Sequence, residues 1–153
     1  MKASVGFIFF MLFLAGLAFV NLQGMKERSD NMVLSVSDIA DTAWRPTHIG
    51  EMRLQDDSEM IIQFKLDNSV VGNSGCNRFF GDYKLTEGAL EIGFLGTTRM
   101  ACPEPGNSFE ISYLDALQAA RTLTRAESRL AMRDDKGVIV ARFVATERGN
   151  AEE

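Results

Sequence analysis

The sequence of 153 residues has few of the residues from which active sites are most often built: one histidine and two cysteines. A Ser-His-Asp or Cys-His catalytic set would have to use His48, and a single histidine is too few for a histidine-rich metal site. We therefore expect His48 to be a surface or hydrogen-bonded structural residue. No catalytic residue, metal or cofactor is expected.

Positive charge is also scarce. The 16 Lys and Arg residues are outnumbered by 21 Asp and Glu residues, the net charge is -5, and no run of basic residues interrupts this balance. Nucleic-acid binding needs a basic face, and binding to an anionic membrane surface needs a basic patch. The composition argues against both classes of partner.

Two motifs of cofactor sites are incomplete. The loop 72–75 has the glycines of a phosphate-binding loop, but it lacks the Lys-Ser/Thr end and opens no expected helix. The pairs Asp56-Asp57 and Asp134-Asp135 lie in segments with turn composition, and the sequence identifies no further oxygen ligands for calcium. Solvated charge is the expected state of both pairs.

One long apolar run lies near the start of the chain. Lys2 precedes it, every residue from Val5 to Val20 is apolar or glycine, and a polar stretch follows. This pattern predicts a signal peptide or signal anchor over 1–24 and a linker over 25–37, with cleavage left open. No cysteine follows the run, which excludes lipoprotein processing. We expect the protein to be periplasmic or anchored to the inner membrane facing the periplasm, or alternatively secreted.

Export determines how Cys76 and Cys102 are interpreted. In an oxidising compartment two cysteines tend to form a disulfide, which here would close a loop of roughly 25 residues and contribute roughly 3 to 4 kcal/mol. Two free buried thiols, or a redox or metal site, are the alternatives. A redox pair is normally spaced Cys-x-x-Cys, and zinc needs more ligands than these residues and His48 provide. A structural disulfide is therefore favoured.

Alternating apolar and polar residues predict a series of short strands. The expected strands are 43–49, 60–66, 70–72, 79–85, 90–94, 122–126, 129–133 and 138–144. In the second of them Phe64 and Leu66 face one side. In the fourth, Phe79 faces away from Phe80, so one ring is expected in the core and the other on the surface, under the helix or against a ligand.

The first expected strand holds the single tryptophan, Trp44. We expect this side chain to anchor the core. Pro46 follows it, and because proline cannot donate a ladder hydrogen bond, the strand is expected at an edge or at a bend.

One segment, 108–121, has helical periodicity. Its apolar stripe is formed by Tyr113, Leu117 and their neighbours, and Glu110 is expected to lie away from that stripe. Asn107 is expected to cap the helix, with Glu110 completing a capping box.

Many short antiparallel hairpins and one helix predict a mainly β fold. We expect a small curled antiparallel sheet, or an incomplete barrel, with one packed α-helix, preceded by the N-terminal apolar signal or anchor helix. Frequent glycines fit strong curvature, because glycine permits bulges and bends. The folded domain is expected over 38–146, with a polar tail over 147–153.

The stretch between the two cysteines holds the candidate binding residues. Asn77 and Arg78 follow Cys76, and Arg99 shortly precedes Cys102, so a disulfide would bring these groups together. Asn77, Arg78 and Arg99 are therefore possible binding residues. The alternative is a structural role, in which polar side chains satisfy the backbone of a tight loop.

Two segments, Val71–Tyr83 and Thr97–Cys102, resemble the two signature segments of the META domain (HslJ-like) family. The Trp44 segment, the helix from Glu110 and the closing hairpin are similar in the same order, over residues 38–146. The resemblance implies a lipocalin-like or half-barrel fold and a disulfide between the signature cysteines. It also implies an envelope or secreted protein linked to stress tolerance, motility and virulence, in a family with no established enzyme activity.

The expected function is that of an exported, non-enzymatic envelope protein that binds another protein or serves stress tolerance. The alternative is a carrier of a small apolar ligand or lipid, which would need a cavity inside the half-barrel. Such a cavity would be lined by residues such as Phe64, Tyr83, Leu90 and Phe143.

Overall fold

The structure is a computed structural model that describes residues 34–56 and 58–146. The predicted signal or anchor segment, most of the linker and the polar tail lie outside these residues. None of the helices described is long and apolar enough to cross a membrane. The elements of the described residues, in chain order, are the 3₁₀ turn η1 (Val36–Asp38), β1 (Ala43–Ile49), β2 (Met52–Arg53), β3 (Ile61–Phe64), β4 (Ser69–Asn73), β5 (Arg78–Thr86), β6 (Ala89–Ile92), β7 (Gly96–Thr97), α2 (Gly106–Ala119), β8 (Thr122–Ala126), β9 (Arg129–Arg133) and β10 (Ile139–Ala145).

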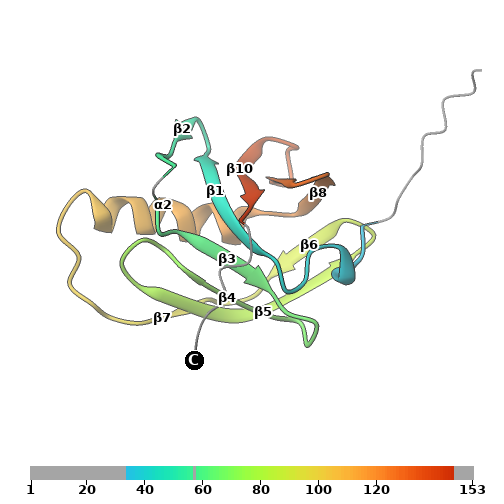
Figure 1. The fold of residues 1–153 in the computed structure, drawn as a ribbon, viewed down its shortest axis with the longest axis horizontal. Coiled ribbons are helices and arrows are strands. Elements are labelled where there is room, and N and C mark those ends of the chain that lie inside the picture. The colour runs from blue at the N-terminus through green and yellow to red at the C-terminus, as the bar shows by residue number, and fades with distance from the viewer. Residues whose placement is uncertain (1–33, 57, 147–153) are drawn as a thin grey trace, which may run out of the picture. The chain divides into compact units, whose positions relative to one another are not determined.

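Eight of the strands form a closed antiparallel barrel (Figure 1). Its order is β1-β3-β4-β5-β6-β8-β9-β10, and β10 pairs back onto β1, with Trp44 opposite Ala145 and Ile49 opposite Ala141. The expectation of an incomplete barrel was therefore wrong. Closure gives both end strands a partner, which removes the unpaired backbone groups of an open sheet. The short strands β2 and β7 attach to β1 and β5.

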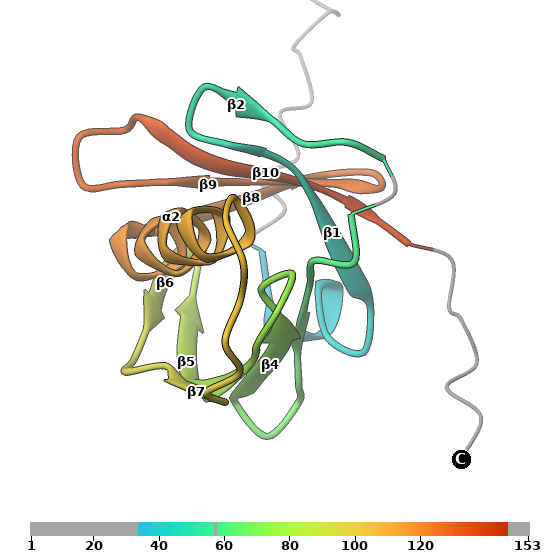
Figure 2. The same ribbon diagram turned by 90° about the vertical axis from the view of Figure 1, so that its left-hand side faces the viewer.

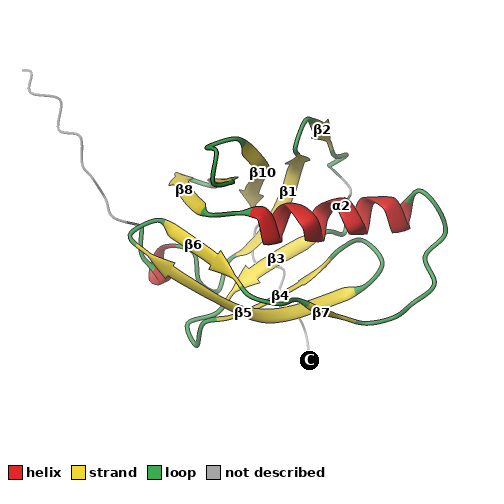
Figure 3. Ribbon diagram, turned by 180° about the vertical axis from the view of Figure 1, so that it is seen from behind, coloured by secondary structure: helices red, strands yellow, loops and turns green. Residues whose placement is uncertain are grey.

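The barrel is held most weakly between β6 and β8, where α2 packs. These strands share one ladder pair, Ala89 opposite Thr122. The helix contacts β10, β1 and β6, and Figures 2 and 3 show it lying between the β8–β10 strands and the β5–β6 strands. Its side chains Tyr113 and Leu117 are fully buried. The helix therefore completes the core at the one place where the strands barely meet.

The alternation of the strands determines which side chains fill the barrel. In β5, Phe79 is 1% exposed, whereas Phe80 is 58% exposed, as the sequence predicted. Trp44 is fully buried, which confirms its expected place in the core, and its indole N–H donates to the carbonyl of Ile39 at 3.1 Å. The largest fully buried side chains are those of Trp44, Tyr113, Phe64, Phe79 and Phe143.

Pro46 marks a bend in a central strand rather than an edge. The register between β1 and β10 shifts between Pro46 and His48, so one extra residue, Thr47, is accommodated there. A β-bulge of this kind increases the local twist. On the other side of β1, β3 pairs before Pro46 and β2 pairs after it, so no strand residue lies opposite the proline there.

Two local expectations were wrong. Leu66 is 64% exposed, because β3 ends at Phe64 and the chain turns directly afterwards. The helix begins at Gly106, so Asn107 lies inside its first turn and makes no capping bond. Glu104 instead accepts hydrogen bonds from the Ser108 hydroxyl and the Asn107 amide, at 2.7 and 3.3 Å.

Candidate functional site

The two signature segments meet at a disulfide. Cys76 lies in the loop between β4 and β5, Cys102 lies just before α2, and the structure joins them with a Cα–Cα distance of 6.1 Å. The bridge predicted from the sequence is therefore present, and it links positions 26 residues apart. It holds the start of β5 beside the segment that leads from β7 into the helix.

Beside this disulfide, the carboxylate of Glu110 reaches out of α2 into the β4–β5 loop. Its Oε2 accepts hydrogen bonds from the Ser74 hydroxyl at 2.9 Å and from the backbone N–H of Asn77 at 3.1 Å. The side-chain amide of Asn77 donates to both carboxylate oxygens at 3.1 Å. All three residues are at most 9% exposed. Hydrogen bonds to a charged group are stronger than neutral ones, so this cluster links the helix firmly to the loop.

The amide oxygen of Asn77 binds the second signature segment, Thr97–Cys102. Its Oδ1 accepts hydrogen bonds from the Thr98 hydroxyl at 2.9 Å and from the backbone N–H of Met100 at 2.7 Å. One amide thus connects the β4–β5 loop, the segment after β7 and α2. The nitrogen and the oxygen of the Asn77 amide both form hydrogen bonds within the fold, which favours the structural role left open by the sequence.

Arg78 and Arg99, the other two candidate residues, are exposed. The backbone of Arg78 pairs with Thr98, which directly precedes Arg99, so the two segments do lie together. Phe80 and Met100, 58% and 62% exposed, add apolar surface in the same segments. A binding role for Arg78 and Arg99 stays a prediction.

The disulfide cluster has the composition, but not the chemistry, of a metal site. The two sulfur atoms and a carboxylate oxygen of Glu110 lie within 4.8 Å of one another. Metals bind cysteine as the thiolate, and the sulfurs of a disulfide carry no such charge. The donor set therefore does not fit a metal while the disulfide is intact.

Glu110 was not among the predicted site residues, and its expected outward position was wrong. Its place in the helix offered a signal: it precedes Tyr113 by three residues and Leu117 by seven, so it shares their face. A carboxylate on the buried face of a helix needs polar partners. The glycine- and asparagine-rich β4–β5 loop supplies them.

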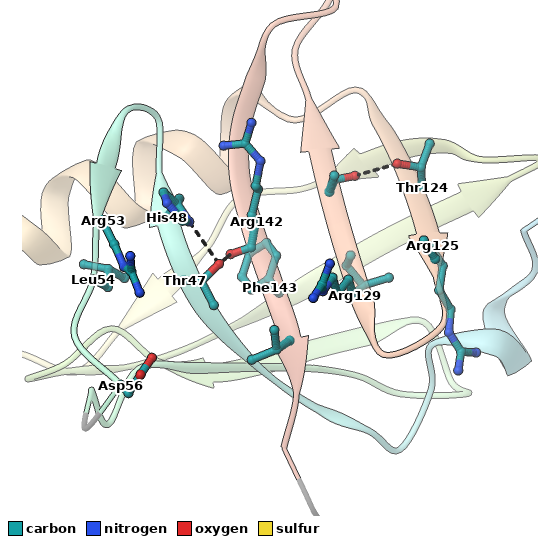
Figure 4. Close-up of a pocket in the computed structure, with 14 residues that line it drawn as sticks. Thr47, His48, Arg53, Leu54, Asp56, Thr124, Arg125, Arg129, Arg142 and Phe143 are labelled. Carbon is teal, nitrogen blue, oxygen red and sulfur yellow. Dashed lines mark hydrogen bonds between the residues drawn. The ribbon is translucent and has the colours of Figure 1, made fainter.

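A second candidate site lies on the outside of the barrel. A groove of about 600 Å³ is formed over β1, β8, β9 and β10 by the segment that contains β2 (Figure 4). Its charged lining consists of Arg53, Arg125, Arg129, Arg142 and Asp56, with His48 beside them. The sequence did not predict this groove, because its arginines come from strands far apart in the chain.

The groove residues differ in how they are held. Asp56 pairs with Arg45 at 3.5 Å. Arg125 donates to the backbone carbonyls of Asp38 and Glu127 and lies 5.8 Å from the Trp44 ring, so it extends away from the groove. His48 is half-buried, as a hydrogen-bonded structural residue would be, and its Nδ1 lies 3.1 Å from the hydroxyl of Thr47.

The guanidinium groups of Arg53, Arg129 and Arg142 are exposed. Within residues 34–56 and 58–146 they form no hydrogen bond and no ion pair. The fold described here therefore makes no use of these three charges.

Both tyrosines have a raised pKa for structural reasons. Burial raises the pKa of Tyr113, whose hydroxyl has no hydrogen-bond partner among the described residues. Burial, and then the nearby charges of Asp67 and Asp41, raise the pKa of Tyr83, whose hydroxyl donates to the carbonyl of Lys65 at 2.9 Å. Neither group lines the groove.

Comparison with known proteins gives a family and a fold. The model of the META domain matches residues 37–147. An NMR structure of a protein from Burkholderia xenovorans is 28% identical with a TM-score of 0.59, covering 74% of this chain and 87% of that one. A crystal structure of a DUF4847 family protein from Bacteroides vulgatus is 14% identical with a TM-score of 0.55, covering 74% of this chain and 99% of that one, and it shows likeness of fold alone. No curated protein matches the sequence.

Proposed function

Because the chain belongs to the META domain family, we propose that it is an exported, non-enzymatic envelope protein that binds another protein and so serves stress tolerance. Its place is the periplasm, free or anchored to the inner membrane through the apolar run from Val5 to Val20. Secretion is the alternative. The barrel is a rigid support, and binding takes place on its outer surface.

The observation that carries this proposal is the state of the signature cluster, which consists of Ser74, Asn77 and Glu110 beside the Cys76–Cys102 disulfide. A catalytic or ligand-binding constellation directs polar groups toward a space that a substrate enters. Here the carboxylate of Glu110 and the amide of Asn77 are instead bonded to each other and to the surrounding loops. A structural cross-link at the signature segments supports a role in binding through surfaces that the fold leaves open.

The alternative, an apolar-ligand carrier, has weaker support. It requires space between Phe64, Tyr83, Leu90 and Phe143, and all four are at most 4% exposed. The Phe64 and Tyr83 rings are in edge-to-face contact at 4.9 Å, and Tyr113 of α2 lies 6.4 Å from the Phe143 ring. Side chains of the protein thus occupy the positions that a carried ligand would need.

Chemical cross-linking in intact cells tests the proposal. The full chain, carrying an affinity tag after residue 153, is cross-linked in its own envelope, purified and compared with an equally expressed, unrelated exported protein. A reproducible partner, together with stress sensitivity on deletion of the gene, is expected. A chain that captures the same proteins as the control and whose deletion has no stress phenotype would contradict it. Bound lipid in the purified material, at one molecule per chain, would favour the carrier.

A further inference from the structure

We propose that the outer groove over β1, β8, β9 and β10 binds an acidic polypeptide segment. The inference rests on the proposed function, since it identifies the chemistry of the protein partner and the surface that it contacts. Nothing in the signature segments is needed for this binding. The argument comes from strand pairing, charge and the shape of the groove.

The first observation is a row of basic side chains across three strands. Arg53 of β2 lies opposite His48 of β1, and His48 lies opposite Arg142 of β10 (Figure 4). Residues directly opposite each other in an antiparallel pair have their side chains on the same face and close enough to interact. The row therefore presents Arg53 and Arg142 on one face of the barrel, on either side of His48, where one anionic ligand can contact both.

A second row runs parallel to the first. Arg45 lies opposite Val144, and Val144 lies opposite Arg129, whose other neighbour is Ala126 of β8. In this row cationic and small apolar side chains alternate. Arg45 is already paired with Asp56, so Arg129 is the charge of this row with no described partner.

Charge complementarity selects an acidic ligand. Among the described residues, the groove is lined by Arg53, Arg129 and Arg142, by Arg125, whose guanidinium extends away from it, and by one aspartate, although the whole chain has a net charge of -5. The single aspartate, Asp56, is engaged by Arg45. The groove is thus a local positive region on an acidic protein, which attracts an anionic partner.

The residue types select a carboxylate on a polypeptide rather than a flat anionic membrane. All the groove's permanent cations are arginine, whose planar guanidinium matches a carboxylate with two parallel hydrogen bonds. Between them lie apolar side chains, Leu54, Ala131 and Val144, which can receive the apolar residues of a peptide. A concave space of about 600 Å³ admits side chains, whereas a bilayer surface would touch only its rim.

Fluorescence anisotropy with a defined probe tests the proposal. The full chain, kept in a mild non-ionic detergent, is titrated against a fluorescein-labelled peptide in which Glu residues alternate with Ala and Leu. The control peptide has Gln at every Glu. We expect the Glu peptide to bind, the Gln peptide to bind at least about tenfold more weakly, and the affinity to fall with added salt.

Two double variants locate the binding. R129Q/R142Q is expected to weaken binding of the Glu peptide by about tenfold. K84Q/K136Q removes the same number of exposed cations from positions outside the groove and the signature segments, and is expected to leave the affinity unchanged. Because the guanidinium groups of Arg129 and Arg142 form no hydrogen bond or ion pair among the described residues, the melting temperature of R129Q/R142Q is expected to equal that of the wild type. Lost binding therefore cannot be attributed to unfolding.

The outcomes separate this inference from the proposed function. Equal binding by wild type and R129Q/R142Q, or an equal loss in both double variants, would overturn the proposal that the groove binds the peptide. Binding of the chain to anionic phospholipid vesicles, without binding of the Glu peptide, would also overturn it in favour of a membrane surface. If a partner is cross-linked in the envelope and R129Q/R142Q captures as much of it as the wild type does, the proposed function stands. The inference that the groove binds this partner is then wrong.

Discussion

The carboxylate of Glu110 accepts a hydrogen bond from the backbone N–H of Asn77, with 3.1 Å between Oε2 and the nitrogen. This contact ties the second turn of α2 to the loop that precedes β5. The Cys76–Cys102 disulfide joins the same loop to the segment just before α2, so a covalent bond and hydrogen bonds to a carboxylate lie side by side here. The connection thereby holds α2, which packs on β10, β1 and β6, to the β4–β5 loop.

The first prediction concerns that carboxylate. Glu110→Ala is expected to lower the free energy of unfolding by about 1 to 3 kcal/mol, because Ser74 and Asn77 lose a charged partner in a buried place. Asp115→Ala, at an exposed position of the same helix, is expected to change it by less than about 0.5 kcal/mol. Urea unfolding followed by the fluorescence of buried Trp44 measures both. Equal effects of the two variants would show that the cluster does not stabilise the fold.

The second prediction concerns the disulfide. Reduction and alkylation of Cys76 and Cys102 is expected to lower the free energy of unfolding by roughly 3 to 4 kcal/mol, because the unfolded chain gains freedom when the loop opens. Urea unfolding of oxidised and reduced protein gives the difference. Thiol titration of the denatured, unreduced protein is the control. Two reactive thiols in protein taken from the oxidising compartment would contradict the bridge.

The third prediction concerns alkaline pH. The sequence has two tyrosines, and the pKa of each is raised, so the folded state favours the neutral phenol over the phenolate. Their contribution to stability is complete below the ordinary pKa of about 10 and is lost as the pH rises above it. Absorbance at 295 nm is expected to show phenolate only above the pH at which free tyrosine ionises, with Tyr113 ionising as near-UV circular dichroism is lost. A single transition at pH 10 with the fold intact would refute it.

The two tyrosines also make a matched pair of variants. Tyr113→Phe removes a buried hydroxyl with no described partner, and the free energy of unfolding is expected to stay constant or rise by up to about 1 kcal/mol. Tyr83→Phe removes a hydrogen bond to the Lys65 carbonyl and is expected to lower it by about 1 kcal/mol. Thermal unfolding compares them. The opposite order would mean that the Tyr113 hydroxyl has a partner.

Local features of the fold could be predicted from the sequence because short-range patterns determine them. The alternation in β5 placed Phe79 and Phe80 on opposite faces with one ring in the core, and the cysteine count favoured the disulfide. The closure of the barrel could not be predicted in this way. Closure depends on the pairing of β1, the first strand of the domain, with β10, the last, in which Trp44 lies opposite Ala145. No local sequence pattern specifies a pairing between segments so far apart in the chain.

In the candidate sites, too, local features could be predicted from the sequence and contacts between distant segments could not. Asn77 was singled out correctly as a residue at the junction of the signature segments, but its partner Glu110 was placed on the wrong face of the helix. A glutamate is assigned to the solvent by residue type, and its buried partners lie in a loop distant in sequence. The arginine groove is a product of pairing between β1, β2, β9 and β10, so only the assembled barrel brings its charges together.

The central claim is that the signature cluster supports the fold while the arginine groove binds the partner. The most direct measurement is partner capture by cross-linking in the cell envelope, with full-length wild type, E110Q and R129Q/R142Q compared at a temperature at which all three are folded. The account predicts capture by wild type and E110Q, and capture reduced about tenfold in R129Q/R142Q. Loss of capture in E110Q, with R129Q/R142Q unaffected, would contradict it and place the binding site at the signature segments.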